Sequence, residues 1–515
     1  MDYWLNLICR YWPHLAAGFD FLAALLASAH ALLHKRDTRA ATLWIGVVWL
    51  MPGFGPILYL TFGVNRIRRR AISLGLKKPS HHAIPKNLGE PQHAGAEHLK
   101  MLAHVVNRIA VFPLTPGNHV QPLVNGDEAF PAMLAAIESA KKSISLSTYI
   151  FDNDPTGGQF AAALGRAVKR GVAVRVLIDS AGARYSWPSV IHELRRSKVT
   201  VARFLPSLAP WRVMTLNLRN HRKLLAVDGQ IAFTGGMNIR HGNMLGKRWG
   251  EATDEPNSRN QNMATTARGD QPSPGCGATG ARPTKNAVQD LQFRVEGPLV
   301  AQLQAAFAND WAFTTGEVLH GENWFPEPRP TGRGVIARVI TDGPDADFET
   351  LRLTLLAALA EAQTSVQILT PYFLPDIALI TALNLAALRG VRVDIILPAK
   401  NNLPFVHWAS RAMWWQMLER GCRIWLTPPP FDHSKLMIVD GHWVLLGSAN
   451  WDARSLRLNF ELNVECYGRE FAHEMTAVLG EKLHGAREVT LAEVDRRALP
   501  AKLRDAAARL FSPFL

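Results

Sequence analysis

Two short segments of this chain carry the same reactive side chains at the same spacing. One runs from His221 to Asn238 as HRKLLAVDGQIAFTGGMN, and the other from His433 to Asn450 as HSKLMIVDGHWVLLGSAN. In each segment the asparagine follows the histidine by 17 residues. A single H-x-K on a strand is usually part of a solvated face, whereas two copies that share further residues indicate a chemical role.

The side-chain types favour chemistry on an anion. Lysine and asparagine donate hydrogen bonds to an anion with several acceptor oxygens, and histidine attacks or donates a proton near neutral pH. Attack needs a neutral imidazole and protonation of a leaving group needs an imidazolium, so two histidines are expected to take separate roles. The candidate residues are His221, Lys223, Asp228, His433, Lys435 and Asp440 as the catalytic motif, and Asn238 and Asn450 as ligands of the anion.

Each segment is expected to fold as a β-hairpin. Side chains two apart on a strand project from the same face, which places the histidine and the lysine together. The apolar runs LLAV and LMIV supply a strand, Asp-Gly makes the turn, and IAFTG or WVLLG begins the return strand. Asp228 and Asp440 stand near these turns and are expected to support the hairpins instead of touching phosphate.

The hairpins lie in two similar halves. In the first half, a helix over 127–142, a strand over 143–151, a helix over 158–169 and a strand over 172–178 are expected. The second half repeats this order over 347–362, 365–373, 377–388 and 391–397, and R-G-V precedes the last strand in both. Alternating strands and helices predict an α/β fold with a mixed, helix-flanked sheet in each half, and the internal similarity indicates duplication.

The doubled motif resembles the phospholipase D superfamily, whose two HKD motifs build one active site between two halves. RGVAVRVLID, DLQFRVEGP, LTPYFLP, LPAKNN and PPPFDHSKLMIVD resemble the bacterial cardiolipin synthase branch, over about 400 residues from Val120 onward. The resemblance implies a phosphohistidine mechanism with His221 as nucleophile and His433 as acid and base, although the motifs leave the opposite assignment open. It implies no metal and no other cofactor, because two lysines supply the positive charge.

Each histidine also needs a partner for its other ring nitrogen. The family has an acidic residue for this purpose in each half. Glu461 follows His433 by 28 residues, and Asp290 takes the equivalent place after His221 once an insert is allowed for. We therefore expect Glu461 to serve His433 and Asp290 to serve His221, although either carboxylate can instead stand at an ordinary strand edge.

Composition indicates an acidic partner. The formal net charge is +14 and the isoelectric point is near 9.8, which favours anionic lipid or nucleic acid. Four cysteines lie far apart in sequence, without the clustering of a disulfide framework or a zinc site. Cys422 and Cys466 lie in strand-like runs and are expected to be buried.

The first 70 residues are expected to be a membrane anchor with a pair of transmembrane helices. Residues 15–33 and 41–64 are long apolar runs, each close to the ~20 residues that span a bilayer. Asp20 is expected to lie near the surface or to pack on the second helix, and prolines and glycines at 52–56 should kink that helix or make it re-entrant. The basic residues that follow place the catalytic body on the cytoplasmic side of a bacterial inner membrane.

The remaining organisation is expected as follows: a linker or short helical approach over 71–118, a first phospholipase D-like domain over 119–333 and a second over 334–515. A Pro-, Gly- and Ser-rich insert at 251–286 is expected to be a disordered loop inside the first domain. The tail from Leu499 to Phe511 is a basic amphipathic helix that either packs on its own domain or lies on a membrane.

Three functional classes are compatible with these residues: a phosphatidyltransferase, a hydrolase or nuclease with the same phosphohistidine, and an inactive scaffold. Two intact motifs oppose the scaffold, and the apolar N-terminus opposes a nuclease. The favoured function is synthesis of cardiolipin from two phosphatidylglycerol molecules, with release of glycerol. The expected partners are phosphatidylglycerol and anionic membrane lipid, with no nucleic acid, and the oligomeric state stays open.

Overall fold

The computed structural model describes residues 2–35, 38–64, 97–205, 218–246, 287–332, 334–343 and 349–512. The expected loop at 251–286 lies outside these residues. The chain divides into two compact units, one of Met1–Lys77 with Pro206–Leu218, and one of Lys78–Leu205 with Arg219–Leu515. Each is described by itself.

The first unit is helical. Its helices are α1 (Asp2–His34), α2 (Thr38–Leu50), α3 (Phe54–Leu58) and the π-helix Tyr59–Gly63. Within the described part of the chain, one helical stretch, Tyr11–His34, is long and apolar enough to cross a membrane. The expected second span is not confirmed, because the second apolar run is interrupted between α2 and α3.

The interruption follows from local sequence. Gly53 has φ of +77°, a conformation that side chains disfavour, and Pro56 lacks the N–H that a continuous helix needs at that position. The carboxylate of Asp20 on α1 accepts a hydrogen bond from the Gly53 N–H at 2.7 Å. This ionisable residue of the apolar helix therefore ties α1 to the break that precedes α3.

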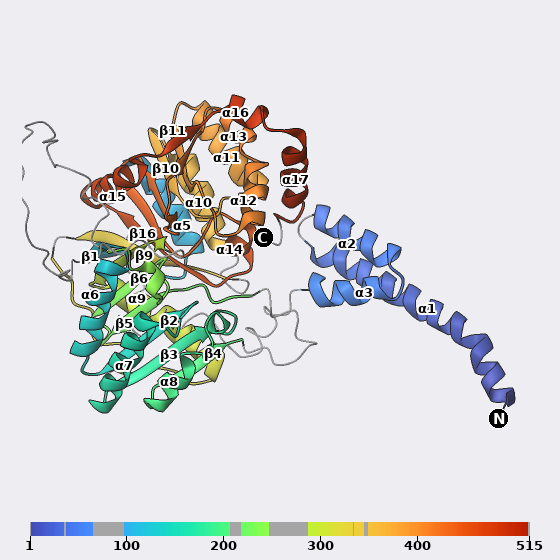
Figure 1. Ribbon diagram of the computed structural model, residues 1–515, viewed down its shortest axis with the longest axis horizontal. Coiled ribbons are helices and arrows are strands. Elements are labelled where there is room, and N and C mark those ends of the chain that lie inside the picture. Colours follow the sequence, from blue (N-terminus) through green and yellow to red (C-terminus); the bar gives the residue numbers. More distant parts are fainter. Residues whose placement is uncertain are drawn as a thin grey trace, which may run out of the picture. The chain divides into compact units, whose positions relative to one another are not determined.

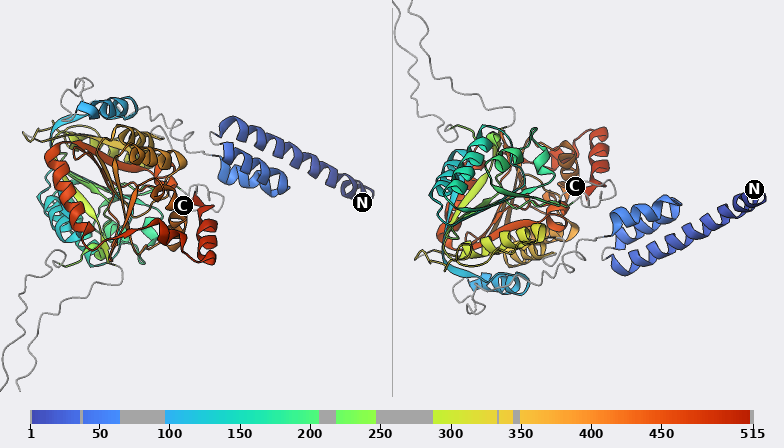
Figure 2. Two further views of the ribbon diagram at one scale, coloured as in Figure 1. Left: turned by 90° about the horizontal axis from the view of Figure 1, so that it is seen from above. Right: turned by 90° about the horizontal axis from the view of Figure 1, so that it is seen from below.

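The second unit is built on a mixed sheet covered by helices (Figure 1; Figure 2 shows it from above and below). The elements of its first half are β1 (Thr115–Val124), α6 (Asn125–Ser139), β2 (Ser143–Thr148), α7 (Pro155–Lys169), β3 (Ala173–Asp179), α8 (Ile191–Arg196), β4 (Thr200–Phe204), β5 (Leu224–Val227), β6 (Ile231–Gly235), β7 (Val288–Gln289), β8 (Leu291–Glu296) and α9 (Leu299–Thr315).

The elements of its second half are β9 (Val335–Asp342), α10 (Thr350–Glu361), β10 (Ser365–Leu369), α11 (Ile377–Leu388), β11 (Arg392–Pro398), α12 (Pro404–Arg411), α13 (Trp415–Leu418), β12 (Arg423–Thr427), β13 (Phe431–Asp432), β14 (Leu436–Val439), β15 (Trp443–Gly447), α14 (Ala453–Arg457), β16 (Glu461–Tyr467), α15 (Arg469–Leu483), β17 (Arg487–Val489), α16 (Leu491–Asp495) and α17 (Leu499–Arg509).

The two halves repeat one topology, as the sequence predicts. β2, β3 and β4 run parallel, and β5 pairs antiparallel with β2 and β6. In the second half β10, β11 and β12 run parallel, and β14 pairs antiparallel with β10 and β15. The strand that follows each histidine-lysine pair, β5 or β14, therefore lies beside the first parallel strand of its own half, β2 or β10. The mixed α/β fold with two repeats is confirmed.

The sheets of the two halves join edge to edge. β1 of the first half pairs antiparallel with β8 and, through Thr115 and Asn118, with β9 of the second half. The strand order β17-β12-β11-β10-β14-β15-β16-β9-β1-β8-β6-β5-β2-β3-β4 is therefore one sheet of 15 strands. The two hairpins lie on either side of this junction. β15 pairs with β16 in the second half, and β6 pairs with β8 in the first.

A helix before β1 also packs on the second half. The short 3₁₀ turn Glu97–Leu99 and α5 (Lys100–Ile109) bury Leu99, Leu102 and Val106 in the same apolar core as α10 and β10. Residues 97–109 belong to the segment expected to be a linker or a short helical approach. Within that segment, α5 packs on the second half and β1 begins at Thr115.

Candidate active site

Each of the two motif segments, 221–238 and 433–450, enters the sheet just after its histidine and lysine. β5 begins at Leu224 and β14 at Leu436, so both residue pairs stand in the extended chain that precedes the hairpin. The pairing of β5 with β2 places Leu224 opposite Ser147, near the carboxyl end of β2. The H-x-K residues of both halves are thus held at the carboxyl edge of parallel strands, where α/β sheets carry their sites.

The two motif aspartates stand at the hairpin turns. Both have φ of +52°. The carboxylate of Asp228 accepts the backbone N–H groups of Lys141, Lys142 and Ser143, at 2.7 to 2.9 Å. Because these bonds tie the turn to the start of β2, Asp228 has the geometry of a structural support.

Asp440 makes the same contacts in the second half. Its carboxylate accepts the N–H groups of Gln363, Thr364 and Ser365, at 2.7 to 2.9 Å. His98, from the turn before α5, adds a contact of 2.8 Å.

The two histidines face each other across the junction. Their ring centroids are 6.3 Å apart, and the ring planes are inclined by 79°. The backbone N–H of His221 donates to the carbonyl of Phe460 at 2.9 Å, and that of His433 donates to the carbonyl of Gln289 at 2.8 Å. Each histidine is therefore positioned by backbone that belongs to the other half.

The carboxylate partners cross between the halves. His221 Nδ1 lies 3.0 Å from Oε2 of Glu461, and His433 Nδ1 lies 2.9 Å from Oδ2 of Asp290. These are the two carboxylates that the sequence analysis names, and each lies within hydrogen-bond distance of a motif histidine. The expected partnership within each half is wrong, because the segment before each histidine pairs with the segment before the other half's carboxylate.

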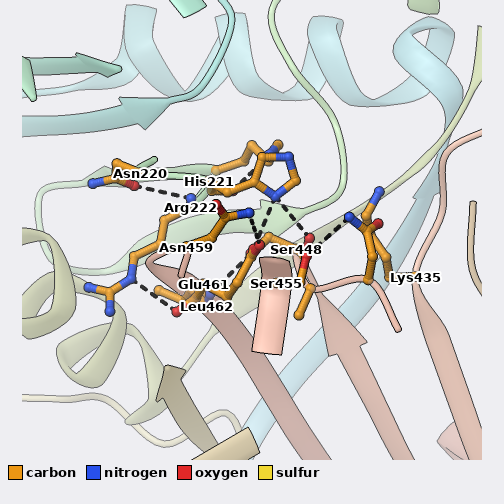
Figure 3. Close-up of polar contacts among 12 residues, drawn as sticks. Asn220, His221, Arg222, Lys435, Ser448, Ser455, Asn459, Glu461 and Leu462 are labelled. Carbon is orange, nitrogen blue, oxygen red and sulfur yellow. Dashed lines mark hydrogen bonds and ion pairs between the residues drawn. The ribbon is translucent and has the colours of Figure 1, made fainter. Parts of the chain in front are cut away.

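Glu461 is held by a set of donors (Figure 3). The hydroxyl of Ser448 donates to Oε2 at 2.5 Å, and the side-chain amide of Asn459 donates to Oε1 at 3.0 Å. Asp290 instead accepts the Leu291 N–H at 2.9 Å. Gly236, the counterpart of Ser448, leaves room there, because a Cβ at that position would collide with Asp290.

Beside His221, Arg222 carries a buried ion pair. Its Nη1 is 2.7 Å from Oδ1 of Asp310, its Nε donates to the Glu461 carbonyl at 3.0 Å, and Nη2 donates to the Asp342 carbonyl at 3.3 Å. Asp310 also accepts from the side chain of Asn220 at 3.0 Å. These bonds fix the extended segment that carries His221, and Figure 3 shows Asn220, His221 and Arg222 of that segment beside Glu461.

The two lysines are buried with few counter-charges. Lys223 donates to the carbonyl of His221 at 2.7 Å, and Lys435 donates to the carbonyl of His433. Burial, opposed in part by Glu461, lowers the pKa of Lys223 to about 7. Burial also lowers the pKa of Lys435 to about 8. A bound anion would reverse both effects, because it stabilises the ammonium form.

Burial acts on the histidines in the same direction. It lowers the pKa of His433 to about 4, with help from the Lys435 charge and against the Asp290 carboxylate. Burial also lowers the pKa of His221, against the Glu461 carboxylate. The two carboxylates stay ionised because the histidines and lysines outweigh burial and lower the pKa of both. Neutral imidazoles with a carboxylate at Nδ1 leave Nε2 as the free, basic nitrogen.

The motif asparagines lie beside the hairpins. The Asn238 side-chain oxygen accepts the Ile150 N–H at 3.0 Å. The Asn450 amide group donates to the Ser455 hydroxyl at 3.2 Å, and its buried oxygen has no hydrogen-bond partner within the described ranges. Asn450 therefore offers one unused acceptor, whereas the oxygen of Asn238 is engaged by backbone.

Two tyrosines flank the histidines and were missed by the sequence reasoning. The Tyr149 ring lies 5.3 Å from that of His221, and the Lys223 ammonium lies 5.6 Å from the Tyr149 centroid. The Tyr372 ring lies 6.3 Å from that of His433. Tyr149 directly follows β2, in STYIF, and Tyr372 follows β10, in LTPYF. Their position at the carboxyl ends of parallel strands was the available signal that they lie near the site.

Comparisons with known proteins bear on this arrangement. A family model described as "Cardiolipin synthase, PLD-like domain" matches residues 133–255 and 355–483, which include both catalytic segments. A second model, "Phospholipase_D-nuclease N-terminal", matches residues 22–63. Among the described residues, no group of three or more His, Cys, Asp or Glu side chains has the arrangement of a metal site.

Several bacterial relatives match nearly the whole chain. The major cardiolipin synthase ClsA of Bacillus subtilis is 30% identical over 510 residues, which cover 96% of this chain and 98% of that protein. A cardiolipin synthase of Oceanobacillus iheyensis is 30% identical, with 97% and 99% covered. Among solved structures, the phosphatidylserine synthase of Haemophilus influenzae has a similar fold, with a TM-score of 0.59 at 12% identity over 81% of this chain and all of that one.

Proposed function

This chain belongs to the cardiolipin synthase family of phospholipase D-like phosphatidyltransferases, and we propose that it transfers a phosphatidyl group from one phosphatidylglycerol to the glycerol headgroup of another. The observation that carries the proposal is the pair of opposed histidines, each bonded at Nδ1 to a carboxylate of the other half. This arrangement gives one site two basic nitrogens that face a common point, as a two-step displacement at phosphorus requires.

The first step forms a phosphohistidine. Nε2 of neutral His221 attacks phosphorus, the bond from phosphorus to the headgroup oxygen breaks, and imidazolium His433 gives its proton to the leaving glycerol. The ring centroids are 6.3 Å apart, close enough for both imidazoles to contact one phosphate group. The anionic lipid favours imidazolium in this site, because its negative charge opposes burial and the lysine charges, which together lower the pKa of His433.

The second step reverses the roles. Neutral His433 removes the proton from a hydroxyl of the second phosphatidylglycerol headgroup, and that oxygen attacks the phosphatidyl group on His221. Cardiolipin leaves and His221 is regenerated. The ammonium groups of Lys223 and Lys435, together with the side-chain amide N–H groups of Asn238 and Asn450, would donate to the nonbridging oxygens while charge develops on them. Exchange of one phosphodiester for another is close to neutral in free energy, so no nucleotide is required.

The membrane arrangement is part of the proposal. Residues 1–70 would anchor the protein, with α1 across an inner membrane, α2 and α3 as a second, broken or re-entrant pass, and the body on the cytoplasmic side. Residues 71–118 would connect the anchor to phospholipase D-like halves at 119–333 and 334–515. The matched ranges 22–63, 133–255 and 355–483 fall within the anchor and the two halves, which supports this division.

The test uses the purified full-length chain with phosphatidylglycerol as the sole substrate. Cardiolipin and free glycerol are expected, and added glycerol should drive the reaction backward. His221→Ala and His433→Ala should give no cardiolipin. His442→Ala is the matched control, because within the described part of the chain the imidazole ring of His442 is hydrogen-bonded to the Asp440 carbonyl in the hairpin turn and not to a residue of the candidate site. Phosphatidic acid as the main product, or a need for cytidine-diphosphate-diacylglycerol, would overturn the proposal.

A further inference from the structure

The last helix of the chain turns its large apolar side chains outward. Leu499 and Leu503 of α17, and Leu510 directly after it, are 67%, 61% and 78% exposed. The opposite face holds Asp505 and Ala508, which are fully buried. A helix that packs on its own domain normally buries its leucines and exposes its charges. α17 has the reverse arrangement, so packing on its own domain does not explain its apolar face.

Specific contacts fix this orientation. α17 lies beside α12, at the periphery of the unit (Figure 1). The buried Asp505 carboxylate accepts from the guanidinium groups of Arg497 and Arg504, each at 2.7 Å, and Arg504 stacks over the Trp408 ring of α12 at 4.3 Å. Rotation of α17 to bury its leucines would break these ion pairs.

The start of α12 extends the apolar surface. Leu403 is 47% exposed and Phe405 is 40% exposed. The Phe405 ring lies 5.6 Å from that of Phe511, which is itself exposed. We call the six side chains of Leu403, Phe405, Leu499, Leu503, Leu510 and Phe511 the docking patch. It is one surface made by two helices that pack together.

The docking patch reaches the mouth of the candidate active site. Leu403 follows Asn402, whose side-chain oxygen accepts the Tyr372 hydroxyl at 2.8 Å, and the Tyr372 ring is 6.3 Å from that of His433. These residues come after β11, at the same carboxyl edge of the sheet as the histidines. A lipid that moved from this patch toward His433 would pass only Asn402 and Tyr372 on the way.

The first half has an exposed aromatic segment at the corresponding place. β3 is the counterpart of β11, and the chain that follows it exposes Tyr185 and leaves Trp187 95% exposed. The Tyr185 ring lies 6.2 Å from that of Tyr149, which in turn contacts His221. Tryptophan and tyrosine are the side chains that favour the headgroup level of a bilayer. Both loops that rim the site therefore present apolar or aromatic groups.

Charge identifies the partner of the docking patch. Lys502 and Arg509 flank the leucine face of α17 on one side, and Arg504 flanks it on the other. An apolar stripe between basic side chains is the pattern of a helix that lies in the surface of an anionic bilayer. Two copies of this chain that met through the same patch would bring like charges together, which costs free energy.

We propose that the docking patch inserts into the surface of a bilayer that contains anionic phospholipid, and that this contact holds the mouth of the active site against the membrane. The proposal rests on the proposed function for the identity of the substrate, but the contact itself does not require turnover. Docking and catalysis are therefore measured separately.

The first experiment reports on the contact alone. In the full-length chain with Cys9 and Cys276 replaced by serine, Leu503→Cys is labelled with an environment-sensitive fluorophore. Leu388→Cys is the matched control, because Leu388 is 64% exposed at the end of α11 that leads into the amino end of β11, at the opposite edge of the sheet. His221→Ala is added to both, so that turnover plays no part.

In vesicles of phosphatidylglycerol and phosphatidylcholine, the probe at 503 should shift to the blue and be quenched by spin-labelled lipid. It should respond less in pure phosphatidylcholine vesicles, and the probe at 388 should not respond in either. Equal responses at 503 and 388 would overturn the proposal. So would a blue shift at 503 that already appears in detergent and grows with protein concentration, because that result means a protein covers the patch.

The second experiment measures the consequence for turnover. Leu503→Asp combined with Leu510→Asp should lower cardiolipin formation in phosphatidylglycerol vesicles by at least about fivefold. The double variant removes two leucines that would insert into the bilayer, and its added negative charges repel anionic lipid. In detergent micelles, where the substrate does not come from a bilayer, the rate of the double variant should stay within about twofold of the rate of the protein without these substitutions. Leu388→Asp should leave both rates unchanged. Equal loss in vesicles and micelles would mean a damaged site and would overturn the docking role, whereas failure of the proposed function would remove activity from every variant.

Discussion

Replacement of Asp290 by asparagine tests the crossed pairing of histidines and carboxylates. Asp290 lies in the first half, yet it bonds to His433 of the second half at 2.9 Å. Asparagine keeps the size of the side chain and removes its charge. The expected result is a change at His433, 143 residues away in sequence, and none at His221 in the same half.

The magnitude follows from the hydrogen bond. A hydrogen bond to a charged group contributes about 1.5 to 3 kcal/mol, and one pKa unit corresponds to about 1.4 kcal/mol. The Asp290 carboxylate raises the pKa of His433 against burial, so its removal should lower that pKa further, by about one to two units. If His433 must be imidazolium to protonate the leaving glycerol, turnover falls about ten- to a hundredfold.

The assay follows the ring nitrogens of isotope-labelled histidine by magnetic resonance as pH is varied, with signals assigned through single histidine variants. Asp290→Asn should move the His433 signals, and Glu461→Gln should move those of His221. Asp394→Asn is the control, because Asp394 is a buried carboxylate that pairs with Arg423 instead of a histidine. If Asp290→Asn moves the His221 signals instead, the crossed pairing is wrong.

Four further outcomes are expected. His221→Ala and His433→Ala should each abolish turnover and leave the melting temperature within a few degrees, and EDTA should have little effect; substantial activity in both variants would contradict a phosphohistidine. Because burial lowers the pKa of Lys223 to about 7, a bound phosphodiester should draw in about half a proton at Lys223 at pH 7 and bind more weakly as pH rises above 7; calorimetry in buffers of different ionisation enthalpy measures this, and Lys223→Met should remove most of the proton uptake at pH 7. Asp228→Ala should lower the free energy of unfolding by about 2 to 4 kcal/mol, through three lost hydrogen bonds, yet keep measurable turnover, as chemical denaturation and rate assays would show. An impermeant maleimide should label the Leu388→Cys variant in inside-out vesicles and not in intact spheroplasts, and the opposite result would reverse the proposed orientation.

Local sequence patterns predicted the hairpins and the repeat well. Asp-Gly turns between apolar runs are specified by neighbouring residues, and β5 with β6 and β14 with β15 form as those runs indicate. The eight motif residues were found because their offsets repeat, and that signal is independent of the fold. The positions of Asp290 and Glu461 were found only through the family resemblance.

The histidine that each carboxylate contacts could not be predicted from local sequence patterns. Glu461 is near His433 in sequence, so local reasoning assigns it there. The crossing depends on contacts between the halves, where Asn220 bridges to Phe460 and β13 pairs with β7. These contacts join segments more than a hundred residues apart, and no local spacing encodes them.

The helices show a second limit of sequence patterns. The positions of Leu499, Leu503 and Leu510 define one face of α17, but this periodicity does not tell whether the face packs on the domain or points away from it. Only the inward contacts of Asp505 settle the direction. The second apolar run had sufficient length for a span, and the backbone at Gly53, with φ of +77°, interrupts it.

The crossed carboxylates also set an order of events during synthesis. His221 leaves the ribosome 240 residues before Glu461, its partner at Nδ1, and the backbone carbonyl of Phe460 that positions it emerges equally late. The growing chain already carries α1, which is apolar enough to enter a membrane while translation continues. During that interval the first half carries His221 but neither the carboxylate nor the backbone that orients its ring. If His221 and His433 work together as proposed, a chain released at that stage has no competent phosphodiester-cleaving site, and the duplicated architecture delays activity until translation is nearly complete.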